Sequence, residues 1–82
     1  MYEELKNAAN KVVGLKQLLR NMEAQRVITI YVADDAEDHV KERIMEAIGK
    51  KEIRVISVET MKELGQVCGI EVGAACAAVI EN

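Results

Sequence analysis

The chain has 82 residues, of which half are apolar and 30% are charged, and its formal net charge is −3. This length predicts one domain over residues 1–82, and the high apolar fraction excludes a disordered chain. No apolar run approaches the roughly 20 residues that are needed to cross a bilayer, which excludes a membrane-spanning protein.

Apolar periodicity in residues 1–33 predicts two helices and two strands. Residues 2–10 have apolar side chains at helical spacing, and a short strand is expected around Val12. Gly14 then leads into a helix over residues 15–24. The apolar stripe of this helix consists of Leu15, Leu18, Leu19 and Met22. Residues 27–32, V-I-T-I-Y-V, are the strongest strand, and their nearly continuous apolar run indicates burial on both faces.

Residues 34–58 predict a helix followed by a strand. Asp34 and Asp35 are expected to cap the helix, and Gly49 with the two lysines after it ends the helix. The apolar side of this helix consists of Val40, Ile44, Met45 and Ile48. Residues 53–58 form the next strand, and the order strand, helix, strand predicts that it runs parallel to residues 27–32.

The last part of the chain predicts a short helix and a final strand. Thr60 opens the helix through a capping box in which Glu63 reaches back, while Gly65 and Gly69 limit its length. Residues 75–80 form a strand of small and β-branched side chains. This order of elements predicts an α/β fold, a three-layer α/β/α sandwich with a small mixed four-stranded sheet.

The charge is distributed unevenly along the chain. Residues 1–26 hold five cations and three acids, whereas residues 27–82 hold six cations and eleven acids. A basic segment on an acidic protein favours one specific site over general binding to nucleic-acid backbones. Only Tyr2 and Tyr31 are aromatic, which disfavours modules that stack unpaired bases on aromatic rings.

The helix start at residues 14–20 is the first candidate site. Lys16, Gln17 and Arg20 fall together on the side opposite the apolar stripe, and Gly14 allows a close approach of the backbone. Free backbone N–H groups and the positive end of the helix dipole favour an anion or a base edge there. The same pattern is also typical of a solvated face on an ordinary amphipathic helix.

The segment C-G-I-E-V-G-A-A, residues 68–75, is the second candidate site. Two glycines in this segment bracket Ile70, Glu71 and Val72 just before the last strand. Apolar side chains that are exposed between these glycines would pack against a base. The alternative is a tight turn in which Ile70 and Val72 point into the core.

The sequence predicts neither catalysis nor a bound cofactor. Cys68 and Cys76 match no zinc-binding spacing, and we expect both to behave as small apolar residues. No residue nearby in the sequence activates either thiol. His39 falls in the first turn of a predicted helix, where solvated histidines are common. Because no catalytic constellation assembles, we expect neither an enzyme nor a metal site.

Three segments together resemble the L-seven-Ae family of kink-turn-binding ribosomal proteins, and its short bacterial members most closely. The segments are G-L-K-Q-L-L-R, then V-A-D-D-A after the central strand, then V-E-T-M-K-E-L-G-Q-V-C-G-I-E-V-G-A-A. The resemblance covers nearly the whole chain in the right order, and L-G-x-x-C-G-I-E-V-G-A-A is its most specific part. It implies an α/β/α sandwich that binds RNA kink-turns, in which a duplex bends sharply at a bulge beside tandem sheared G·A pairs.

The resemblance also implies a role for each candidate residue. The helix start would enter the widened major groove at the G·A pairs, with Gly14 giving close backbone approach and Leu15 replacing a threonine that is common in the family. Lys16 and Gln17 would read guanine edges. Arg20 stands at the family's lysine position and would bind guanine or phosphate. The wall against the bulged nucleotides would consist of Ile70, Glu71 and Val72.

We therefore expect a non-catalytic protein that binds kink-turn RNA as a monomer. The acidic start M-Y-E-E differs from a secretion signal, so we expect the protein in the cytoplasm, without a membrane partner. We expect it to associate with the ribosome or with structured mRNA leaders. The alternative is a protein-interaction module of the same fold that does not bind RNA, in which Lys16, Gln17 and Arg20 form a plain solvated face.

Overall fold

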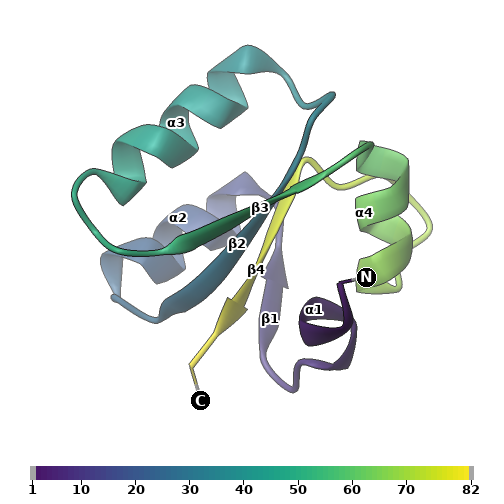
Figure 1. The fold of residues 1–82 in the computed structure, drawn as a ribbon, viewed down its shortest axis with the longest axis horizontal. Coiled ribbons are helices and arrows are strands. Elements are labelled where there is room, and N and C mark those ends of the chain that lie inside the picture. Colours follow the sequence, from purple (N-terminus) through teal and green to yellow (C-terminus); the bar gives the residue numbers. More distant parts are fainter. Residues whose placement is uncertain (1, 82) are drawn as a thin grey trace.

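The computed structural model describes residues 2–81, which form four helices and four strands (Figure 1). The helices are α1 (Glu3–Asn7), α2 (Leu15–Glu23), α3 (Asp38–Ile48) and α4 (Met61–Cys68). The strands are β1 (Lys11–Val13), β2 (Val27–Ala33), β3 (Arg54–Val58) and β4 (Cys76–Ile80). Within residues 2–81, every helix is too short or too polar to cross a membrane.

The four strands form one mixed sheet with the order β1-β4-β2-β3. β2 and β3 are parallel, as predicted, and Ile30 lies opposite Val55. β4 runs antiparallel to both β1 and β2, so the last strand of the chain lies inside the sheet. Neighbouring strands and helices enclose β4, and its small residues Ala77 and Ala78 are fully buried.

Two helices cover each face of the sheet, which confirms the predicted α/β/α sandwich (Figure 1). α2 and α3 pack on one face over a core that includes Leu18 and Ile30. α1 and α4 cover the other face, where Leu5 and Leu64 belong to the same core as Tyr31. Ile30 and Tyr31 belong to different cores because successive side chains of a strand point to opposite faces of the sheet.

The first and third helices differ in detail from the prediction. α1 ends at Asn7 and not at residue 10, because Ala8 already has an extended backbone conformation. On α3, Ile44 and Ile48 are buried as predicted, but Met45 is 61% exposed and is not part of the apolar side. Met45 follows Ile44 directly, so its side chain points about 100° away around the helix.

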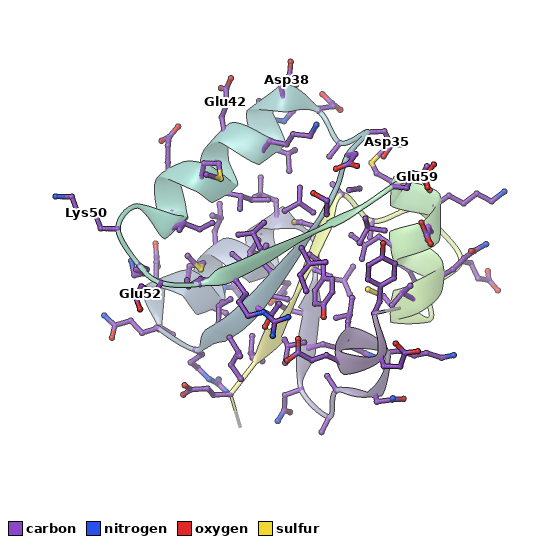
Figure 2. The ribbon with its side chains drawn as sticks, in the orientation of Figure 1. Asp35, Asp38, Glu42, Lys50, Glu52 and Glu59 are labelled. Carbon is purple, nitrogen blue, oxygen red and sulfur yellow. The ribbon has the colours of Figure 1, made fainter. Side chains whose placement is uncertain are left out.

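The predicted capping of α3 by Asp34 and Asp35 is wrong. The residue at the N-cap of α3 is Glu37, and its side chain makes no capping hydrogen bond. Asp35 instead accepts a hydrogen bond from the backbone N–H of Met61, with 2.8 Å between Oδ1 and the nitrogen. Figure 2 shows Asp35 beside the start of α4. The loop after β2 is therefore tied to α4 and not to the helix that follows it.

The start and the end of α4 follow the prediction, but its interior does not. The Thr60 hydroxyl accepts a hydrogen bond from the backbone N–H of Glu63 at 3.0 Å, which is the N-cap half of the predicted capping box. Gly69 ends the helix with φ of +79°, the left-handed conformation that favours glycine. Gly65 was expected to limit the helix, yet it lies inside α4 and is buried.

Candidate functional site

The start of α2 lies directly beside the first residue of β4. Gly14, the residue before the helix, has φ of +97°, a conformation that side-chain-bearing residues rarely adopt. Its N–H donates a hydrogen bond to the carbonyl of Cys76 at 2.9 Å. Among residues 2–81, no atom outside the adjoining chain lies within 4 Å of the place where a Cβ of Gly14 would stand. The backbone at Gly14 is therefore open to a partner.

The first turn of α2 carries backbone N–H groups that precede its internal hydrogen bonds. The first of these bonds joins the N–H of Leu18 to the carbonyl of Gly14 at 3.0 Å. The N–H groups of Leu15, Lys16 and Gln17 come before it, and Gly14 has no side chain that caps them. Together with the positive end of the helix dipole, these groups favour an anion or a hydrogen-bond acceptor.

Two cationic side chains and one amide surround this helix start. Lys16, Gln17 and Arg20 are all exposed, as their helical spacing predicts. Within residues 2–81, no hydrogen bond or ion pair engages any of these three side chains. Leu15 is half-buried and packs against the core under α2. The helix start therefore presents donors of hydrogen bonds that the protein itself does not use.

The loop between α4 and β4 keeps its apolar side chains at the surface. Val72 is 70% exposed, Ile70 is 36% exposed, and Glu71 between them is also exposed. The alternative in which Ile70 and Val72 point into the core is therefore wrong. Two apolar side chains of this loop are available for contact with a partner.

Hydrogen bonds to α4 hold this loop near both of its ends. The N–H of Ile70 donates to the carbonyl of Gly65 at 3.0 Å, and the N–H of Ala74 donates to the carbonyl of Met61 at 2.9 Å. Gly73 lies against Met61, whose Cβ would be 3.2 Å from a Cβ added to this glycine. The loop therefore runs back along α4 from the last turn of the helix to its first turn.

Gly65 is the residue that lets the loop approach α4 so closely. A Cβ at this position would overlap the carbonyl oxygen of Val72, and it would lie 3.2 Å from the Cα of Gly73. These are backbone atoms, which cannot rotate away as a flexible side chain can. The close contact explains why a glycine is buried in the middle of a helix.

The loop and the start of α2 reach the same end of the sheet (Figure 1). The carbonyl of Cys76 at the start of β4 accepts from Gly14, and the carbonyl of Ala75 accepts from the N–H of Ala33 at 2.9 Å. Because β4 lies between β1 and β2, the loop enters the sheet between the strand ends that lead to α2 and to α3. Two segments that are far apart in the sequence thus lie at one end of the molecule.

Burial disfavours the thiolate form of both cysteines. Both are free, and Cys76 is fully buried in the core, where burial raises the pKa of its thiol to about 11. Burial also raises the pKa of the Cys68 thiol. A thiol acts as a nucleophile or metal ligand in its deprotonated form. In the part of the chain that the structure describes, no group of three or more His, Cys, Asp or Glu residues is arranged to hold a metal ion.

Comparison with known proteins gives the family of the chain. The model described as the Ribosomal protein L7Ae/L30e/S12e/Gadd45 family matches residues 1–82. The chain belongs to this family. The resemblance to the L-seven-Ae proteins, which rests on three segments of the sequence, is thereby confirmed.

Bacterial relatives in the L7Ae family are similar over most of the chain. An RNA-binding protein of Caldanaerobacter subterraneus is 50% identical over 68 residues, which are 83% of each chain. An RNA-binding protein of Halalkalibacterium halodurans is 40% identical over 78 residues, which are 95% of each chain. The RNA-binding protein YbxF of Geobacillus stearothermophilus is 34% identical over 79 residues, which are 96% of each chain.

Two solved structures have the same fold as this L7Ae-family chain. A protein of unknown function from Bacillus halodurans has a TM-score of 0.81 at 21% identity, over 94% of this chain and 77% of that chain. The 15.5 kD RNA-binding protein of Giardia lamblia has a TM-score of 0.79 at 18% identity, over 95% of this chain and 68% of that chain. At these levels of identity, the likeness establishes the fold alone.

Two residues that shape this part of the L7Ae-family fold do not stand out in the sequence. Asp35 ties the loop after β2 to the start of α4, but its partner Met61 is 26 residues further along the chain. No local pattern indicates a contact at that distance. Gly65 has a weak signal, because a glycine inside a helical pattern often has a packing reason. The identity of its partner, the backbone of Val72, becomes visible only in the fold.

Proposed function

We propose that this L7Ae-family chain is an RNA-binding protein that recognises kink-turns as a monomer in the cytoplasm. One observation carries the proposal: an uncapped helix start with unpartnered Lys16, Gln17 and Arg20 reaches the same end of the sheet as a loop with exposed apolar side chains. The RNA-binding relatives support RNA as the class of partner. The ribosome and structured mRNA leaders are the proposed sources of such an RNA.

In the proposed complex, the start of α2 enters the major groove beside the sheared G·A pairs. Lys16 donates to guanine O6 and N7, and the Gln17 amide binds a neighbouring base edge, which are pairings that base-edge chemistry allows. Arg20 lies one helical turn beyond Lys16, about 6 Å along the axis, and binds guanine or phosphate. Gly14 and Leu15 bring the backbone of the first turn close to the RNA.

The loop provides the second part of the proposed interface. Ile70, Glu71 and Val72 form the wall against the bulged nucleotides. Within residues 2–81, Val72 is the most exposed of the large apolar residues, so contact with a base would remove apolar surface from water. A helix start that reads base edges and a wall that holds unpaired nucleotides together fit an RNA that combines a duplex with a bulge.

A gel-shift titration tests the proposed function. The probes are an RNA kink-turn and a control RNA in which Watson–Crick pairs replace the tandem G·A pairs. We expect binding to the kink-turn and an affinity for the control that is weaker by at least about fivefold, since one well-made base contact discriminates by about 1–3 kcal/mol. Equal affinity for the two RNAs would contradict kink-turn recognition.

A pair of lysine variants extends this titration. Lys16→Ala should weaken kink-turn binding by about 1–3 kcal/mol and reduce the discrimination between the two RNAs, because it removes a base-edge contact. Lys51→Ala removes the same charge from an exposed position beyond the end of α3 and should change the affinity very little. Equal losses for both variants would mean that the protein binds RNA only through its diffuse positive charge.

A protein-interaction module of the same fold is the second candidate function. The net charge of −3 favours it, as do the carboxylates of Asp38 and Glu42, which project outward from α3 (Figure 2). In that case neither RNA probe shifts in the gel, and Lys16→Ala does not change the binding of either RNA. The same titration therefore separates the two functions.

A further inference from the structure

An open groove runs between α2 and α3, the two helices that cover the same face of the sheet. It is lined by Leu15, Lys16, Leu19, Arg20, Glu23 and Arg43. All but one of these residues belong to α2, from its first residue to its last, and Arg43 belongs to α3. The groove therefore begins at the helix start of the candidate site and leads away from it along α2.

The groove is positively charged, although the chain as a whole is negative. Three cations and one carboxylate line it, whereas the formal net charge of the chain is −3. Within residues 2–81, no hydrogen bond or ion pair neutralises Lys16, Arg20 or Arg43. A groove lined mainly by cations raises the local concentration of anions, and cations spaced along it are placed to contact successive charges of an extended anion.

Arg43 is the residue through which α3 takes part in this groove. Its two neighbours in the sequence point elsewhere: Ile44 is buried in the core, and Figure 2 shows Glu42 pointing away from the molecule. Successive residues of a helix point about 100° apart, so α3 presents Glu42 to solvent and Arg43 to the groove. In the sequence, Arg43 lies near Glu42 and Glu46, so the local charge pattern does not indicate that Arg43 belongs to a positively charged groove.

We infer that Arg43, which lines the same groove as Lys16 and Arg20, binds the phosphate backbone of the RNA stem that continues past the G·A pairs. The inference rests on the proposed function, because it extends the same RNA-binding surface from α2 onto α3. A guanidinium forms two parallel hydrogen bonds to a phosphate, which positions a duplex without reading its sequence. Glu23 at the other end of the groove repels phosphate and confines the contact to the part nearer the helix start.

Arg43→Ala tests this inference, with Arg54→Ala as the matched control. Arg54 is also an exposed arginine, but it lies on β3 and lines a different groove with Tyr2 and Glu4. We expect Arg43→Ala to weaken kink-turn binding about three- to tenfold at roughly 50 mM salt, and to reduce the slope of log affinity against log salt by about one. Arg54→Ala should change the affinity less than about twofold, as expected for a charge outside the interface.

The discrimination between RNAs gives a second readout. Because phosphate contacts carry no sequence information, Arg43→Ala should leave the affinity ratio between the kink-turn and the Watson–Crick control unchanged. Arg43→Lys should retain part of the lost affinity, since it keeps the charge but not the two-pronged geometry. Circular dichroism of each variant checks the fold, which a substitution of an exposed residue should not alter.

The possible results have different consequences for the two proposals. If wild-type protein prefers the kink-turn and the two arginine variants bind equally well, this inference is overturned and the proposed function stands. If Arg43→Ala reduces the preference itself, Arg43 reads bases and the assignment to phosphate is overturned. If wild-type protein does not bind the kink-turn at all, both proposals are overturned together.

Discussion

At the scale of single residues, two valines differ in their exposure to solvent and therefore in what they contribute. Val72 lies on the loop after α4 and is 70% exposed, whereas Val58 lies at the end of β3 and is fully buried. A buried valine contributes to folding because its apolar surface leaves water, and an exposed valine contributes little. The pair therefore allows contributions to stability and to binding to be measured separately.

Val72→Ala should change the free energy of unfolding by less than about 0.5 kcal/mol, because the side chain is already in contact with water. In the proposed complex it should weaken kink-turn binding by up to roughly 1 kcal/mol, through lost apolar contact with a bulged nucleotide. Thermal unfolding and RNA titration measure the two effects on the same protein.

Val58→Ala is the control for this experiment. It should lower the free energy of unfolding by about 1–3 kcal/mol, because it removes buried methyl groups and leaves a cavity. Its folded fraction should bind RNA as the wild-type protein does. A Val72→Ala variant that loses stability and keeps its full affinity would contradict the proposed role of the loop.

Some properties of single residues can be predicted from the sequence and others cannot. Helical spacing places Lys16, Gln17 and Arg20 on one exposed side, because position around a helix depends only on separation along the chain. The exposure of Ile70 and Val72 cannot be derived in this way. Their apolar character favours burial, and the glycines around them permit either direction.

At the scale of elements, α4 and the loop after it behave as one unit. The loop runs back along the helix and donates two hydrogen bonds to helix carbonyls, which fix its path. It contacts the helix closely at Gly65. Asp35 attaches the first turn of this helix to the loop after β2. The position of Ile70 and Val72 therefore depends on the position of α4.

Gly65→Ala should destabilise the protein by about 1–3 kcal/mol, the usual cost of inserting an atom into closely packed surroundings. The sign is informative, because in a helix free of such contacts the same substitution would stabilise by up to about 1 kcal/mol. Urea unfolding measures the change, and kink-turn binding should weaken as the loop is displaced.

Gln66→Ala is the control for Gly65→Ala, since Gln66 is the next residue of α4 and is exposed. It tests the helix propensity of alanine without the close contact, so its effect on stability should be within about 0.5 kcal/mol. Stabilisation of the protein by Gly65→Ala would show that the loop does not need this close approach.

The elements themselves could be predicted largely because their signals are local. Apolar periodicity locates α2, α3, β2 and β3 closely, and Thr60 and Gly69 mark the two ends of α4. Contacts between elements have no comparable local signal. Asp35 satisfies the sequence pattern of a cap for α3, yet the fold brings the N–H of Met61 to its carboxylate.

At the scale of the whole molecule, the arrangement of charge separates regions of opposite sign. The positive groove lies between α2 and α3, whereas acidic residues line other parts of the surface. Figure 2 shows Asp38 and Glu42 on the outer side of α3, and Asp35 and Glu59 near the start of α4. Such a distribution favours one orientation of a polyanion on the protein and disfavours binding over the rest of its surface.

The affinity for a kink-turn should therefore depend less steeply on salt than that of a protein with about ten phosphate contacts. Few cations face the proposed interface, so we expect about three to five phosphates to be neutralised and a slope of log affinity against log salt of roughly −3 to −4.5. Titrations between about 50 and 200 mM salt measure it. A slope near −10, which corresponds to about ten phosphate contacts, would contradict a small interface.

The overall topology could be predicted only in part from residue patterns. The pairing of β2 with β3 follows from the strand–helix–strand order, because such crossovers give parallel strands. The place of β4 between β1 and β2 depends on contacts across the whole chain. Its small side chains indicate close packing, but they do not name the neighbours. That place is what brings the loop after α4 next to Gly14.

The hydrogen bonds that hold the loop after α4 also affect the entropy of binding. Ordering the backbone of a flexible loop costs about 1–2 kcal/mol for each residue. In this protein the N–H groups of Ile70 and Ala74 are already bonded to α4 in the free state, so the loop is ordered before any partner arrives. Most of this entropy is lost once, when the chain folds, and is not lost again at each encounter. A preorganised loop therefore retains more of its contact energy as affinity.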